Sequence, residues 1–116
     1  MSDVTIYHNP SCGTSRNTIA LLREKGIEPK VVEYLKTGWT REQLKDLLQR
    51  MDASARDILR VKGTKADELG LTEPGVSDDA IIAAMIIDPI LVNRPIVVSE
   101  KGAALCRPAE LVLGLI

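Results

Sequence analysis

Cys12 is the residue of this sequence whose surroundings most favour reactivity. A short apolar run at residues 4–7 predicts a buried strand that stops at Asn9-Pro10, and a loop of small residues then carries the cysteine. We expect Thr14 or Ser15 to cap the helix that follows. In this layout backbone N–H groups and the helix dipole point at the sulfur, which favours the thiolate and the binding of an oxyanion. We therefore interpret Cys12 as a nucleophile.

The residues around the two cysteines exclude several other cysteine chemistries. Ser15 stands where a C-x-x-C dithiol has its second cysteine, so Cys12 would need an external thiol to complete a redox cycle. Thr18 occupies the position of the arginine in the C-x₅-R loop of tyrosine phosphatases. Cys106 falls on a predicted strand, and we expect it to be inert.

Three arginines are candidate ligands for an anion near Cys12. Arg60 is expected to end a helix, Arg94 precedes a proline before a predicted strand, and Arg107 precedes a proline after one. A solvated surface charge is the alternative for each arginine taken singly. Arg94 and Arg107, however, lie at strand ends, where α/β proteins often place ligands. The planar guanidinium suits a tetrahedral oxyanion and lowers the pKa of a nearby thiol.

The elements that must position these residues read as βαβ, a helical insert and ββα. Gly26 ends the first helix, and a capping box at residues 40–43 opens the first helix of the insert. The expected strands are 4–7, 31–35, 96–98 and 103–106, and the expected helices are 15–25, 41–51, 54–60, 80–87 and 109–115. The first two strands should be parallel and the last two a hairpin. We predict an α/β, thioredoxin-like fold with a mixed four-stranded sheet: one domain at 1–116, with a helical insert at about 40–88.

The charge and the apolar pattern of the sequence argue against several classes of function. The chain has 116 residues and a formal net charge of −1, which gives no electrostatic reason to expect binding to nucleic acid or membranes. No apolar run approaches ~18 residues, and residues 1–4 lack the basic start of a signal peptide. We therefore expect a cytoplasmic protein with free thiols. No cluster of His, Cys and carboxylates has metal-ligand spacing, so we expect no metal.

The sequence closely resembles the glutaredoxin-coupled arsenate reductase family, whose fold is thioredoxin-like with a helical insert. The likeness covers essentially the whole chain, and three blocks in the correct order carry it. These blocks are residues 6–17 (IYHNPSCGTSRN), Leu59-Arg60, and residues 93–98 (NRPIVV) followed by Cys106-Arg107-Pro108.

The resemblance implies a role for each matching residue. Cys12 would attack arsenate, and the anion would be held by Arg60, Arg94 and Arg107. His8 and Ser15 match residues near the thiolate, and we expect His8 to tune it, the alternative being a purely structural histidine. The resemblance also implies a cis Arg94-Pro95 bond. The chain would need no bound cofactor, glutathione would be a co-substrate, and glutaredoxin would cleave the Cys12–glutathione disulfide.

Two other functions are the alternatives for a chain of this type. One is a redox-sensing regulator resembling the Spx group, which binds RNA polymerase, but members typically carry a second cysteine at the position of Ser15. The other is a glutathione-dependent thiol reductase of another substrate, which should not require all three arginines. Both features favour arsenate reduction.

Overall fold

The computed structural model describes residues 3–116, and the chain divides into two compact units. The first contains the residues up to Thr37 together with Arg94–Ile116, and the second is Gly38–Asn93. The second unit includes the residues, about 40–88, that were expected to form a helical insert. Across residues 3–116, no helix has the length and apolar character needed to span a membrane.

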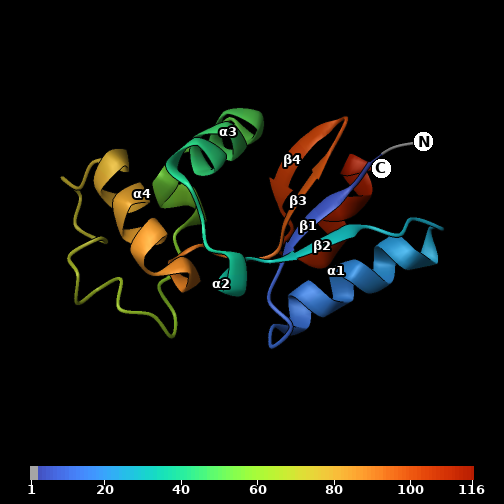
Figure 1. Ribbon diagram of the computed structural model, residues 1–116, viewed down its shortest axis with the longest axis horizontal. Helices are drawn as coiled ribbons and strands as arrows, with labels where there is room; N and C mark the ends of the chain where they lie inside the picture. Colours follow the sequence, from blue (N-terminus) through green and yellow to red (C-terminus); the bar gives the residue numbers. More distant parts are fainter. Residues whose placement is uncertain (1–2) are drawn as a thin grey trace. The chain divides into compact units, whose positions relative to one another are not determined.

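The first unit is built on a mixed four-stranded sheet, which confirms the predicted fold class (Figure 1). Its strands are β1 (Thr5–His8), β2 (Lys30–Glu33), β3 (Ile96–Ser99) and β4 (Gly102–Leu105), in the spatial order β2-β1-β3-β4. β1 pairs parallel with β2 and antiparallel with β3, and β3 pairs antiparallel with β4. The carboxyl end of β1, at His8, leads directly into the loop that carries Cys12.

Two helices cover one face of this sheet. α1 (Gly13–Glu24) and η3 (Ala109–Leu115) pack against each other and against the strands (Figure 1). Their shared core is aliphatic, with one cysteine, and consists of Val4, Ile6, Ile19, Leu22, Val97, Cys106, Val112 and Leu115. Burial of these side chains fixes α1 on the sheet, and with it the position of the Cys12 loop at the helix start.

The start of α1 differs from the prediction. The helix begins at Gly13, and its N-cap is Cys12 in an extended conformation, not Thr14 or Ser15. The Ser15 hydroxyl is already used, because it accepts a hydrogen bond from the Asn9 amide at 3.2 Å. At the other end, Gly26 follows the helix with φ +78°, as expected for a residue that closes a helix in the left-handed region.

The second strand is shorter than predicted. β2 ends at Glu33, and a single helical turn, α2 (Tyr34–Thr37), replaces the expected continuation. The register explains the difference, because Glu33 pairs with His8, the last residue of β1. Beyond Glu33 the strand has no ladder partner on β1, so extended backbone gains no further hydrogen bonds there.

The second unit is helical. It contains α3 (Arg41–Met51), η1 (Ala55–Ile58), α4 (Asp78–Ile87) and η2 (Pro89–Leu91). The capping box of α3 is confirmed: the Gln43 amide donates to Thr40 Oγ1 at 3.1 Å, and the Thr40 amide donates to Gln43 Oε1 at 3.3 Å. Ser77 caps α4 through the Ala80 amide.

Two expected α-helices are 3₁₀ helices instead. The segment expected at 54–60 is 3₁₀ only over Ala55–Ile58, and the segment at 109–115 is 3₁₀ throughout. Short segments close with i→i+3 bonds because they offer too few residues for a stable α-helical ladder. Arg60 therefore lies after this helix, next to the Leu59–Val92 bridge, and does not end the helix itself.

Candidate active site

Cys12 lies at the junction of the β1 loop and α1. Its side chain is nearly buried, with 8% of the residue exposed. The Cys12 amide donates to the Asn9 carbonyl at 3.0 Å, and the Arg16 amide donates to the Cys12 carbonyl at 3.0 Å as the first bond of the helix. The amides of residues 13–15 therefore remain outside the helix's own hydrogen bonds and form the positive end of its dipole.

Two of the three predicted arginines meet Cys12. Arg107 follows β4, and its Nη1 lies 3.5 Å from Cys12 Sγ. The same nitrogen donates to the Arg94 carbonyl at 2.9 Å, which links the residues before β3 to those after β4. Arg94 also donates to the thiolate through its side chain. The bonds Arg94-Pro95 and Arg107-Pro108 are both cis, the first as the resemblance implied.

The pKa of Cys12 is lowered from the ordinary 9.0 to about 7. Burial is the largest single influence and raises the pKa, because it disfavours the charged sulfur. The Ser15 backbone amide and the Arg94 and Arg107 side chains together outweigh burial. The Ser15 amide acts on the sulfur without forming a regular side-chain cap of the helix. Near neutral pH a large fraction of Cys12 is therefore thiolate, the nucleophilic form.

His8 and Ser15, predicted to support the thiolate, occupy different surroundings. Ser15 is fully buried, its hydroxyl bonds to the loop, and its amide acts on Cys12. His8 is 7% exposed and lines a groove together with Arg16 and Glu33. Its pKa is lowered by burial, while Glu33 raises it and Arg16 lowers it. The neutral imidazole is thus the form that this environment favours at neutral pH.

Arg60 belongs to the second unit. Its Nε donates to the Lys62 carbonyl at 3.2 Å, and its Nη1 donates to Asn93 Oδ1 at 3.4 Å. The Arg60 amide also donates to the Leu91 carbonyl at 2.7 Å. These bonds hold Arg60 beside Asn93, the last residue of the second unit.

Cys106 has the environment of a core residue. It is fully buried within the aliphatic core of the first unit, and its Sγ lies 3.7 Å from the Ala104 carbonyl, to which it donates. Burial raises the pKa of this thiol to about 11, so it stays protonated at neutral pH. At neutral pH Cys106 is therefore a protonated thiol, whereas a large fraction of Cys12 is thiolate, although both are free cysteines.

Asn9 was not assigned a role from the sequence, although it is buried beside Cys12. Its side-chain Oδ1 accepts from the Ser11 amide at 2.9 Å. An Asn followed by Pro at a strand end is a sequence signal for such a turn, since Asn readily accepts a bond from the amide two residues on.

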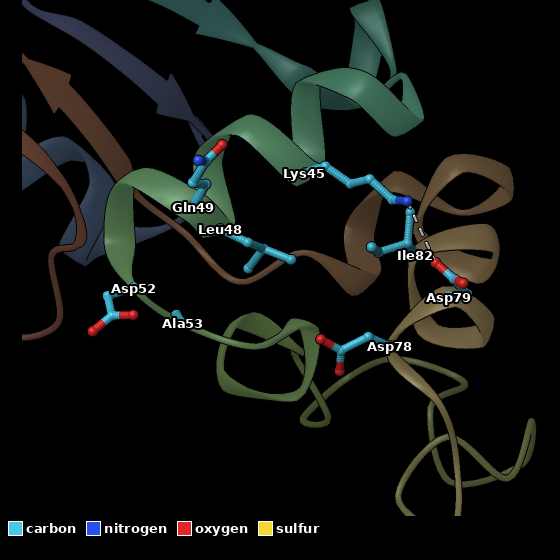
Figure 2. A pocket seen from close by; sticks show the side chains of 8 residues that line it. All are labelled: Lys45, Leu48, Gln49, Asp52, Ala53, Asp78, Asp79 and Ile82. Atoms are coloured by element: carbon cyan, nitrogen blue, oxygen red, sulfur yellow. Dashed lines mark ion pairs between the residues drawn. The ribbon is translucent and has the colours of Figure 1, made fainter.

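A hollow in the second unit is also lined by several charged side chains (Figure 2). Lys45 of α3 points toward Asp79 of α4, at 3.7 Å, and Arg41 lies 3.5 Å from the same oxygen. Asp78 accepts a hydrogen bond from the Ala55 amide at 3.3 Å. These charges are paired within the unit, and the hollow contains no cysteine. Over residues 3–116, no group of three or more His, Cys, Asp or Glu could hold a metal ion.

Comparison with known proteins gives consistent matches. The model of the ArsC family matches residues 7–115. An arsenate reductase of Rhizobium meliloti (strain 1021) is 51% identical over 113 residues, which cover 97% of this chain and 81% of that protein. An arsenate reductase of Escherichia coli (strain K12) is 49% identical over 116 residues, 100% of this chain and 82% of that protein. The solved structure of an arsenate reductase from Vibrio cholerae matches with a TM-score of 0.93 at 44% identity, over 98% of both chains. The chain therefore belongs to the ArsC family, with its thioredoxin-like fold.

Proposed function

We propose that this protein is an arsenate reductase in which the Cys12 thiolate attacks arsenate. The observation that carries the proposal is the placement of Arg107 Nη1 at 3.5 Å from Cys12 Sγ, at the N-terminus of α1. A nucleophile and a binding site for its anionic electrophile thus coincide. Relatives named arsenate reductases, at about half identical residues, support the choice of arsenate as the oxyanion.

The first step forms a covalent adduct. The Cys12 sulfur gives an electron pair to arsenic, an As–O bond breaks, and the departing oxygen leaves as hydroxide or, with a proton, as water. Arsenic remains As(V) in this adduct. The guanidinium groups of Arg94 and Arg107 and the amides of residues 13–15 would stabilise the negative oxygens, because they are fixed donors in a shielded site.

Reduction follows when a glutathione thiolate attacks the Cys12 sulfur. An S–S bond forms, the S–As bond breaks, and its electron pair stays on arsenic, which leaves as arsenite, As(III). The two sulfurs supply the two electrons and end as a Cys12–glutathione disulfide. A glutaredoxin thiolate then attacks the glutathione sulfur and releases the Cys12 thiolate.

The proposal assigns roles to three further residues. Arg60 would be a third ligand of the anion, and the Ser15 amide would help to stabilise the thiolate. His8, as a neutral imidazole, would tune the same group. The protein would hold no prosthetic cofactor and would act in the cytoplasm, where reduced glutathione is available.

The test is a coupled assay of arsenate-dependent NADPH oxidation with glutathione reductase, glutathione and glutaredoxin. Cys12→Ser should abolish turnover while the circular dichroism spectrum and the Tm stay close to those of the wild type. Cys106→Ala is the matched control, since it also removes one thiol, and it should retain activity. Turnover by Cys12→Ser would overturn the assignment of the nucleophile. If the wild-type protein had a reactive Cys12 but no activity on arsenate, the assignment of arsenate as the substrate would be wrong.

A further inference from the structure

Asn9 shapes the loop that carries Cys12 through its side-chain oxygen, its backbone carbonyl and its backbone amide. The residue is 4% exposed. Its side-chain Oδ1 accepts from the Ser11 amide at 2.9 Å, and its backbone carbonyl accepts from the Cys12 amide at 3.0 Å. Its own amide donates to Ser15 Oγ at 3.2 Å. One buried residue thus joins the end of β1, the loop and the first turn of α1.

These bonds decide which amides face the sulfur. The Ser11 and Cys12 amides are directed back to Asn9 and are not available to an anion. The amides of residues 13–15 have no such partner in the loop, and the helix leaves them free of i→i−4 bonds. Cys12 is held as the N-cap, with φ −96° and ψ 120°, so its side chain leaves the chain at the positive end of α1.

The identity of the side chain matters as well as its position. An aspartate would supply an acceptor of the same size to the Ser11 amide, but its charge would oppose a thiolate three residues away and an incoming oxyanion. A serine would reach less far and form this kind of turn more weakly. Asn is the residue that combines the reach of Asp with a neutral acceptor.

We propose that Asn9 is a positioning residue for Cys12, supplying a buried neutral acceptor that holds the loop so that the thiolate faces the free amides of α1. This inference deepens the proposed arsenate chemistry, because the same amides would bind the oxyanion. It concerns the state of Cys12 before any substrate binds, so it is testable without arsenate.

The experiment is a pH titration of the Cys12 thiolate by its ultraviolet absorbance, on the full chain and without arsenate. Wild-type Cys12 should titrate near its pKa of about 7, well separated from Cys106 at about 11. Asn9→Ala removes the acceptor, and Asn9→Asp keeps it but adds a charge. Both substitutions should raise the Cys12 pKa by roughly one unit or more. Such a rise lowers the ratio of thiolate to thiol at Cys12 about tenfold at a given pH. The control is Asn17→Ala, an exposed position of α1, which should leave the pKa unchanged.

A merely structural role predicts a different result. In that case Asn9→Ala would lower the Tm, but the Cys12 pKa of that variant would stay near its wild-type value, and the proposal would be wrong. Should Asn9→Ala fail to fold, Asn9→Leu takes its place, because leucine has about the size of asparagine but offers no acceptor, and an unchanged Cys12 pKa in that variant would equally contradict the proposal. Assays with arsenate should then show kcat/KM reduced roughly tenfold in the variants with a raised pKa. Inactive wild type with the expected titrations would reject the substrate and keep the role of Asn9.

Discussion

At the scale of single residues, the reactivity of Cys12 is a balance between burial and donors. Burial by itself would keep the sulfur protonated, as it does at Cys106. Cys12 differs because Arg94, Arg107 and the Ser15 amide surround it. Two thiols of one small protein thus differ by several pKa units, and the cause is the groups that face each sulfur.

Arg107→Lys should weaken this site although it conserves charge. One guanidinium nitrogen contacts both Cys12 Sγ and the Arg94 carbonyl, and the planar fork has further donors for an oxyanion. A single ammonium cannot reproduce this geometry. We expect the KM for arsenate to rise roughly tenfold and the Cys12 pKa to increase, as measured by steady-state kinetics and thiolate absorbance.

The matched control for this prediction is Arg50→Lys. Arg50 is an exposed residue of α3 that pairs with Asp46 at 3.0 Å, and it should tolerate the change in both measurements. If Arg107→Lys behaved like Arg50→Lys, the guanidinium of Arg107 would have no special role in anion binding.

At the scale of elements, helix and strand ends set the positions of the functional groups. β1 ends at His8, α1 begins after Cys12, β3 begins after Arg94-Pro95, and β4 ends before Arg107. The start of α3 stabilises the fold instead, because both halves of its capping box are formed at Thr40 and Gln43.

Thr40→Ala should therefore destabilise the protein by about 1 kcal/mol without altering Cys12. The change removes the acceptor of the Gln43 amide and leaves one donor of the first turn unsatisfied. Urea unfolding measures the free energy, and thiolate absorbance measures the pKa of Cys12. Thr40→Ser keeps a hydroxyl and should recover most of the loss, and equal losses in both variants would speak against the cap.

At the scale of the whole molecule, the thiolate links stability to pH. The folded state holds the pKa of Cys12 at about 7 against the ordinary 9.0, so between these values the unfolded chain binds more protons. The free energy of unfolding therefore rises with pH across this window. The contribution of the thiolate is fully present above pH 9.0 and is lost as the pH falls through about 7.

Wild type should gain stability relative to Cys12→Ser as the pH rises. Between about pH 6 and about pH 8.5, we expect the difference in unfolding free energy between the two proteins to grow by about 2 kcal/mol. Urea unfolding at the two pH values measures it. Cys106 is present in both proteins, so its own titration cancels. A difference that stayed constant with pH would show that the fold does not stabilise the thiolate.

Local sequence signals predicted most of the elements. The parallel pair β1–β2, the β3–β4 hairpin, the α3 capping box and Gly26 at the end of α1 all follow from residues close together in the chain. Two of the errors came where a hydrogen-bond partner outside the element decides. β2 ends because β1 ends, and the N-cap of α1 is Cys12 because the Ser15 hydroxyl is bonded to Asn9.

By itself, the sequence determined that one cysteine follows a strand and precedes a helix, and that arginines flank two prolines near the end of the chain. Those features are local, so residue types and spacing suffice to identify them. That the two units act as one domain with an insert, and that Arg60 serves the same anion, remain predictions. Only the tertiary structure shows how close Arg107 lies to Cys12, that Asn9 shapes the Cys12 loop, and which groups make one thiol acidic and leave the other protonated. The reason is physical: a pKa depends on burial and on charges brought close in space, and the partners of Cys12 are up to 95 residues away in the chain.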